Sequence, residues 1–225
     1  MGEAIGQVLP LAVGVALSPI PIIAVVLMLG TPRGSSNGPA FLIGWIIGLS
    51  AAGAAVLLIS SGADASNQGA PADWVSWLKI VLGLLLLAVA SKQWRARPRA
   101  GAEAELPRWM RTIDRFTPGR SVAMAVALSA INPKNLLLVV GAAAAIAQAG
   151  IDGGDQAIAL AVFVIIATLG PGLPVGIYLA MRERAARVLE DLKDWLAANN
   201  PVIMAVLCLI IAAKLIGDAI SGLAG

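Results

Sequence analysis

The chain has 225 residues, of which 59% are hydrophobic and only 13% are charged. Soluble domains carry roughly 45–50% apolar and about 25% charged residues, so this composition excludes an ordinary soluble domain and predicts a lipid environment. The net charge of +3 is too small to predict a nucleic-acid partner, and the absence of histidine removes the commonest metal ligand, so we expect no metal site.

Several apolar stretches reach the roughly 20 residues that a helix needs to cross about 30 Å of hydrocarbon. Backbone groups in lipid must bond within the chain, and these stretches show no two-residue alternation, so we expect helices rather than barrel strands. The start Met1–Glu3 has no basic segment, which predicts a retained first helix. The predicted fold class is an all-α integral membrane protein. Its six transmembrane helices are expected at residues 4–29, 38–61, 74–93, 120–149, 155–181 and 200–221.

A short motif occurs twice, in the first and fourth of these helices. Residues 15–21 read Val-Ala-Leu-Ser-Pro-Ile-Pro, and residues 126–133 read Val-Ala-Leu-Ser-Ala-Ile-Asn-Pro. The copies lie three helices apart in the chain order, and an odd offset inverts the second copy in the membrane. Inverted repeats with proline-broken helices at matching positions are typical of transporters. We therefore expect two inverted three-helix repeats, over residues 1–94 and 120–225, joined by a cytoplasmic basic loop over residues 95–119.

Proline should interrupt both copies near the middle of the membrane. Pro19 and Pro21 in the first copy and Pro133 in the second lack a backbone donor and clash with the preceding turn, which frees carbonyl groups. Bare carbonyls are tolerated there only against protein or a water-lined cavity. Polar partners are expected from Ser18, Ser129, Asn132 and Asn135. A third helix break is expected in the fifth helix, at Gly170, Pro171 and Pro174. The alternative is that all three are kinks that serve only packing.

Lys134 is the most informative single residue. It lies deep in the fourth helix, where a lysine costs roughly 2.5–3.5 kcal/mol on insertion scales, and no Asp or Glu lies at a comparable depth. We expect it to be held by freed carbonyls or to face an anionic group of a substrate, the alternative being that it reaches a membrane surface. Lys79 and Lys214 lie in the outer thirds of their helices, and we expect them to extend to the headgroups.

The connections fix the orientation. Lys and Arg number 1, 8 and 4 in the first, third and fifth connections, the third taken from Lys92 to Arg120, and none in the second and fourth. This distribution predicts cytoplasmic odd-numbered connections and both termini outside. After Pro107, the spacing of Trp109, Ile113 and Phe116 predicts an interfacial helix, the alternative being a solvated basic loop. Residues 185–199 have helical spacing, and Asn199-Asn200-Pro201 is expected to end that helix before the last membrane helix begins.

Glycine pairs with small-xxx-small spacing occur in the second and fifth helices, at Gly44 and Gly48 and at Gly172 and Gly176. Such pairs permit close contact between membrane helices. We expect packing within the chain first, and a homodimer as the second interpretation.

These residues resemble the motifs of the LysE transporter superfamily, in which a Pro-x-Pro motif in the first helix pairs with Asn-Pro-Lys in the fourth. They stand here as Pro19-Ile20-Pro21 and Asn132-Pro133-Lys134. Within that superfamily the chain is most similar to the GAP family, named for glycolipid-addressing proteins of cell envelopes. Amino-acid exporters usually have glycine where this chain has Ile20, which argues against amino-acid export. The resemblance implies a LysE-like fold in a bacterial plasma membrane, the cell inner membrane.

Two functions are consistent with these features. The first is a secondary transporter or exporter that works by alternating access and moves a small or amphiphilic cargo outward, with an anionic, lipid-linked cargo as one candidate. The second is an accessory scaffold that assists envelope lipid export by a separate machine. No hydrolase, zinc-peptidase or Walker motif is present, so we expect neither an enzyme nor a cofactor. The expected partners are membrane lipids and the cargo. The expected substrate-binding residues are Ser18, Pro19, Pro21, Ser129, Asn132, Pro133, Lys134 and Asn135.

The distribution of basic residues makes the orientation testable. Cysteines introduced as Ser66→Cys and Gly154→Cys should react with an impermeant thiol reagent in intact cells, whereas Ala102→Cys should not, because the basic loop should face the cytoplasm. Labelling confined to Ala102→Cys would reverse the orientation.

Overall fold

The computed structural model describes residues 1–62, 66–67, 70–71, 73–97, 108–181 and 184–224. The described chain is almost entirely helical. Its helices are α1 (Gly2–Ala16), α2 (Pro19–Leu29), α3 (Gly34–Gly62), α4 (Asp73–Arg95), α5 (Pro118–Val126), α6 (Pro133–Gln148), α7 (Gly153–Met181) and α8 (Ala185–Ala224). Two shorter helical segments are the 3-10 helix η1 (Arg108–Arg115) and the π-helical turn η2 (Ala127–Ile131). The strands β1 (Ser66–Asn67) and β2 (Ala70–Pro71) form a two-residue antiparallel ladder, with Ser66 opposite Pro71.

Four helices of the described chain, α3, α4, α7 and α8, are long and apolar enough to cross a membrane. Two bent pairs pass the same test: α1 with α2, bent by 49°, and α5–η2 with α6, bent by 62°. Counting each bent pair as one span gives up to six. Side chains such as Leu58, Ile59 and Ile165 are 64–76% exposed, as expected for a surface that faces lipid. The helical, multi-pass membrane character predicted from the sequence is therefore confirmed.

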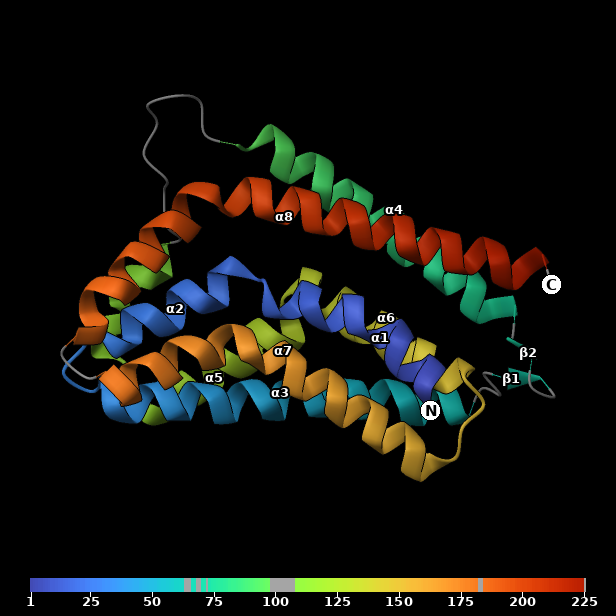
Figure 1. Cartoon of the computed structure of the whole chain (residues 1–225), viewed down its shortest axis with the longest axis horizontal. Helices are drawn as coiled ribbons and strands as arrows, with labels where there is room; N and C mark the ends of the chain where they lie inside the picture. Colours follow the sequence, from blue (N-terminus) through green and yellow to red (C-terminus); the bar gives the residue numbers. More distant parts are fainter. Residues whose placement is uncertain (63–65, 68–69, 72, 98–107, 182–183, 225) are drawn as a thin grey trace.

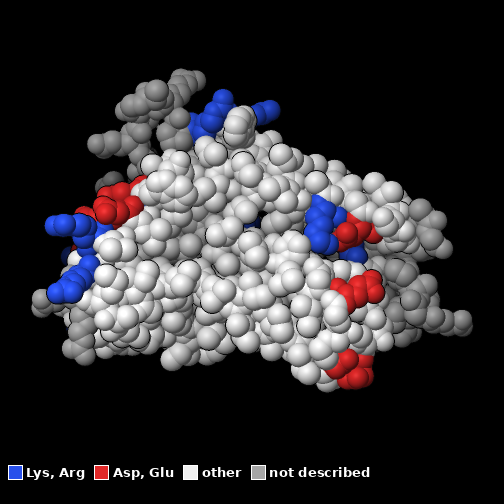
Figure 2. All heavy atoms as spheres, in the orientation of Figure 1, with Lys and Arg blue, Asp and Glu red and all other residues white. Residues whose placement is uncertain are grey.

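The helices form one bundle with two distinct ends (Figure 1). Both termini and the connection after α6 lie at one end, which we call the acidic end; the turns after α2 and α7 lie at the other, which we call the basic end. Helix α3 packs on α5 and α6, α1 packs on α7 and α6, and α4 packs along α8. Charged side chains gather toward the two ends in Figure 2, and the visible face between them is almost uncharged.

Two expected interruptions are wrong. Helix α7 runs unbroken from Gly153 to Met181 with Pro171 and Pro174 inside it, so the Gly170–Pro174 segment does not break the helix. Helix α8 likewise continues through Pro201, although Figure 1 shows that its first part turns relative to the rest. A proline removes one helical hydrogen bond and bends a helix, and packing on neighbouring helices keeps the remaining turns intact.

Glycines let α3 and α7 approach the two bent pairs closely. A Cβ at Gly44 would lie 2.4 Å from the Val122 carbonyl oxygen, and one at Gly48 would lie 2.0 Å from Ser129 Oγ. On α7, a Cβ at Gly170 would lie 1.9 Å from the Ala16 carbonyl oxygen. The Gly44/Gly48 pair thus packs within the chain, as predicted.

The second predicted glycine pair does not behave in this way. A Cβ at Gly172 would meet only Thr168 of its own helix, at 3.9 Å, and one at Gly176 would meet nothing within 4 Å. The close contact of α7 is made by Gly170, which the spacing rule did not single out.

The segment after Pro107 forms η1. Its Ile113 is 1% exposed, and Phe116 just beyond it is 8% exposed; both belong to the hydrophobic core, and Asn37 Nδ2 donates a hydrogen bond to the Phe116 carbonyl oxygen at 3.1 Å. These two side chains therefore face protein rather than lipid. The side chain of Trp109 and all of residues 98–107 lie outside the described residues, so the interfacial helix stays a prediction.

The contact between Gly170 and Ala16 predicts an unusual response to a methyl group. Gly170→Ala should lower stability by about 1–3 kcal/mol, because the added carbon meets a backbone oxygen that cannot move independently of α1. Gly176→Ala in the same helix is the matched control and should be neutral or stabilising by about 0.5–1 kcal/mol, since its position is open. Thermal unfolding in detergent measures both, and equal midpoints for the two variants would contradict the close contact.

Candidate functional site

The first break separates α1 from α2 at Leu17 and Ser18. Pro19 is the first residue of α2, where no backbone donor is needed, so the proline starts a new helix. The Ser18 N–H, which in a continuous helix would bond the Gly14 carbonyl, donates instead to the Val15 carbonyl at 3.1 Å. The Gly14 carbonyl is thereby left without its helical donor.

At the second break, as at the first, a proline begins the following helix and a backbone carbonyl loses its helical donor. Helix α5 loosens into the π turn η2, in which the Asn132 N–H donates to the Ala127 carbonyl at 3.0 Å. Pro133 then begins α6, and the Asn132 side chain caps that helix by accepting the Lys134 N–H at 3.1 Å. The Leu128 carbonyl loses its helical donor and accepts Asn135 Nδ2 at 2.9 Å.

Lys134 joins the two breaks. Its Nζ donates to the Gly14 carbonyl oxygen and to Ser18 Oγ, both at 2.6 Å. Ser18 Oγ in turn donates to Asn135 Oδ1 at 2.9 Å, so Ser18 accepts from one residue of α6 and donates to the next. Lys134 and Ser18 are each 4% exposed and Asn135 is 0% exposed. Such a chain of buried hydrogen bonds rigidifies the place where both helices are interrupted.

The charge of Lys134 is held by neutral oxygens. In the described part of the chain Lys134 forms no ion pair, since the two salt bridges there are Lys193–Asp194 and Lys214–Asp218. An ammonium group has three donors, and two of them are used here. One donor and an uncompensated positive charge therefore remain, which suits an anionic oxygen.

The predicted site residues are only partly brought together. Ser18, Asn132, Lys134 and Asn135 share the network, and Pro19, Pro21 and Pro133 lie in the first turns of α2 and α6 that frame it. Ser129 does not join them: its Oγ donates to the Val126 carbonyl at 3.2 Å, beside Gly48 of α3. Gly170 contacts the first break through Ala16, not through a helix break of its own.

Sequence reasoning expected freed carbonyls but did not identify which two act as acceptors, and it missed the close contacts of Gly14 and Gly170. The Gly14 and Leu128 carbonyls are backbone atoms, so only their position four residues before Ser18 and Asn132 pointed to them. Gly14 also needs its small size, because a Cβ there would lie 2.3 Å from Cδ1 of Ile211 on α8.

Lys79 does not extend to the headgroups, which corrects that expectation. It is 3% exposed, and its Nζ donates to Oε1 of Gln148, the last residue of α6. The side chain therefore reaches from α4 to a buried acceptor on α6. Lys214 is partly exposed and pairs with Asp218 one turn along the same helix.

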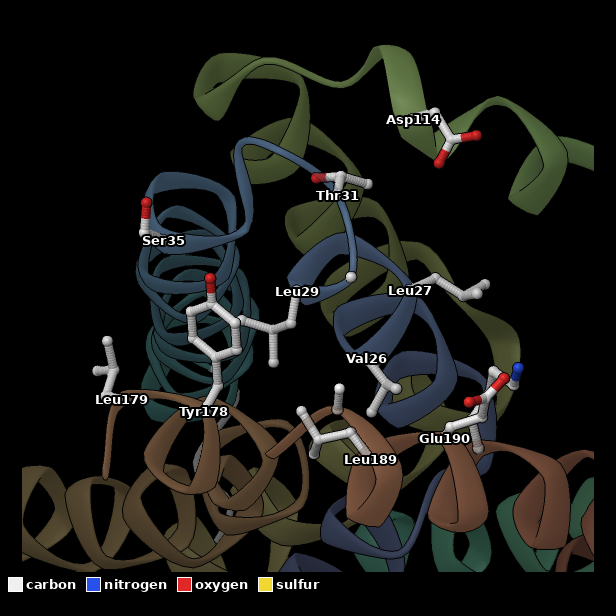
Figure 3. A pocket seen from close by; sticks show the side chains of 13 residues that line it. Val26, Leu27, Leu29, Thr31, Ser35, Asp114, Tyr178, Leu179, Leu189 and Glu190 are labelled. Atoms are coloured by element: carbon white, nitrogen blue, oxygen red, sulfur yellow. The ribbon is translucent and has the colours of Figure 1, made fainter. Parts of the chain in front are cut away.

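A cavity of about 850 Å³ opens at the basic end, between α2, the start of α3, η1, the end of α7 and the first turns of α8 (Figure 3). Its lining combines apolar and polar side chains. Asp114 and Glu190 lie on different walls, and Tyr178 points its hydroxyl into the space between Ser35 and Thr31. Lys193 also lines the cavity, but it pairs with Asp194 at 3.1 Å. The cavity lining thus combines leucine and valine side chains with the carboxylates of Asp114 and Glu190, which accept hydrogen bonds. Its apolar lining residues are Val26, Leu27, Leu29, Leu179, Ala186 and Leu189.

Comparisons with known proteins bear on the whole chain. No match was found among the curated proteins or among the solved structures. The family model described as Sap, sulfolipid-1-addressing protein, matches residues 8–221, which include both breaks, the Lys134 network and the cavity. A match over nearly the full length cannot come from one apolar helix, and the chain therefore belongs to the sulfolipid-1-addressing protein family.

Proposed function

We propose that this protein is a secondary transporter, and not an enzyme, which moves an amphiphilic cargo out of the cell by alternating access at the two broken helices. The observation that carries the proposal is the bond from Lys134 to the freed Gly14 carbonyl, which couples the two breaks. Broken membrane helices whose freed groups meet at mid-membrane are a recurring feature of transporter sites. The family description names a sulfolipid, which favours a lipid-related cargo.

The packing supports two inverted repeats of the LysE type. In these repeats, α1–α2 would correspond to α5–α6, α3 to α7 and α4 to α8. When each helix is replaced by its counterpart, most of the observed helix contacts become other observed contacts. The contact of α1 with α7 becomes that of α5 with α3, and α2 with α8 becomes α6 with α4. Gly48 of α3 and Gly170 of α7 also each pack on the break of the opposite repeat. Both termini at one end of the bundle are consistent with an even number of spans.

The charge around Lys134 supports an anionic group on the cargo. Its third donor and its uncompensated charge suit a phosphate, sulfate or carboxylate oxygen. The cavity at the basic end, by contrast, presents Asp114 and Glu190, which accept hydrogen bonds. A head that combines an anionic oxygen with hydroxyl or amine donors fits both places, and a zwitterionic metabolite is the smaller alternative.

The location follows from the same features. We propose a bacterial plasma membrane with both termini outside, so that the basic end meets the anionic cytoplasmic leaflet and the cavity opens toward the cytoplasm. Membrane lipids and the cargo are then the immediate partners, with a homodimer as a further one.

An accessory scaffold is the second candidate. Its supporting observation is that Lys134, Ser18 and Asn135 already satisfy one another in a buried network, which is what a purely structural element requires. A scaffold would present the basic loop to a separate export machine and would need no path through the bundle.

Variants of Lys134 separate the two candidates. Lys134→Ala should abolish transport while the protein still folds, and Lys134→Arg should impair it, because a guanidinium keeps the charge but not the shape. Lys214→Met is the matched control: it removes a lysine that pairs along its own helix, and transport should persist. The assay is flux or leaflet exposure in proteoliposomes with anionic-headed and neutral-headed amphiphiles of equal chain length.

The two candidates predict opposite results in this assay. Selective transport of the anionic amphiphile by purified wild-type protein, lost in Lys134→Ala, supports the transporter. Equal movement of both amphiphiles, unchanged in Lys134→Ala, would remove the anion site and favour the scaffold.

A further inference from the structure

A buried polar contact joins α4 and α6 at the acidic end. Lys79 lies in the second turn of α4, and Gln148 is the last residue of α6. Lys79 is 3% exposed and donates to Gln148 Oε1. One turn deeper, Leu82 of α4 packs over Gly141 of α6. We call the contact of these four residues the outer seam.

The outer seam is incompletely satisfied. An ammonium group has three donors, and the described acceptor of Lys79 is one amide oxygen. Ser76, one turn before Lys79, is 0% exposed, and its Oγ has no hydrogen-bond partner among the described residues. Buried polar groups that lack partners regain them when water enters. Separating α4 from α6 at this end would therefore exchange one hydrogen bond for several with water, whereas an apolar seam would resist hydration.

The two ends of the bundle differ in this structure. At the basic end, the cavity of about 850 Å³ separates α2 from the first turns of α8. At the acidic end, Lys79 and Gln148 hold α4 against α6. Lys134 lies between the two ends and is itself buried. In the described chain, a cavity thus lies at the basic end and a buried polar contact at the acidic end.

We propose that Lys79 and Gln148 form the gate at the acidic end, and that its opening accompanies closure of the cavity at the basic end. The proposal concerns two conformations of the bundle, one with the gate closed and the cavity open and one with the gate open and the cavity closed. Only the gate's use for cargo release rests on the proposed function. In the proposed correspondence between the two repeats, α4 is equivalent to α8 and α6 to α2. Helices α8 and α2 are among those that line the open cavity. A transporter that alternates between ends would open one of these pairs while the other closes.

Cysteine reactivity tests the gate without any cargo. In a Cys208→Ser background, Ala144→Cys reports on the outer seam, because Ala144 is 1% exposed and one turn from Gln148 on the same face of α6. Val26→Cys reports on the cavity, which Val26 lines. A hydrophilic thiol reagent is applied to the purified protein in detergent, and labelling rates are measured.

Gln148→Ala and Lys79→Ala should each speed labelling at Ala144→Cys by about tenfold, the scale on which loss of one interhelical hydrogen bond shifts an opening equilibrium. The same variants should slow labelling at Val26→Cys, because the two ends alternate. Lys92→Ala is the matched control and should change neither rate, since Lys92 is exposed in the last turn of the same helix, far from the outer seam. The double variant Lys79→Met/Gln148→Leu replaces the polar seam with an apolar one, which water does not favour, and should label at Ala144→Cys no faster than the parent.

Unchanged labelling at Ala144→Cys in both single gate variants would overturn the proposal, as would equal acceleration by Lys92→Ala. Faster labelling at both reporters would show general loosening and would also overturn it. The double variant Lys79→Met/Gln148→Leu controls for misfolding, because it removes both polar partners and leaves no buried lysine without an acceptor. If the gate behaves as expected but proteoliposomes show no flux, the conformational change stands and the transport function fails.

Discussion

The hydrogen bonds of Lys134 make each broken helix depend on the other. A lysine at mid-membrane is costly, and a carbonyl released by a helix break is costly as well, because neither meets water there. The Gly14 carbonyl and Lys134 Nζ, 2.6 Å apart, lower both costs together. The breaks can therefore persist in lipid only while α1 and α6 stay aligned. Any movement that separates them needs a replacement partner for the ammonium group, and the oxygen of a cargo or a water molecule is a suitable one.

Close packing by glycine holds that alignment from both sides. Gly48 admits η2 against α3, and Gly170 admits the end of α1 against α7. Helices in lipid gain little from the hydrophobic effect between them, so backbone approach through small residues provides much of the attraction.

Polar groups at the two ends are arranged differently. Asp114 and Glu190 line an open cavity at the basic end, whereas Lys79 and Gln148 bond across a closed contact at the acidic end. Between the ends, the described partners of Lys134 are two neutral oxygens, which leave one donor and the positive charge uncompensated. A head group moving from the cavity toward Lys134 would therefore pass from acceptors of hydrogen bonds to a donor. This order favours a head with both kinds of group over a simple anion.

The sequence by itself determined the properties that depend on local composition. Apolar runs of membrane length, the repeated Ser18 and Ser129 motifs and the prolines that start α2 and α6 could all be read from neighbouring residues, because hydropathy and proline stereochemistry act over a few positions. The helical membrane class and the burial of Lys134 followed from these. Only the tertiary structure decided which groups meet across helices. It selected the Gly14 carbonyl for Lys134 and Gln148 for Lys79, and it left Ser129 against α3. It also kept α7 and α8 continuous through their prolines, since packing on neighbouring helices outweighs the loss of one helical hydrogen bond.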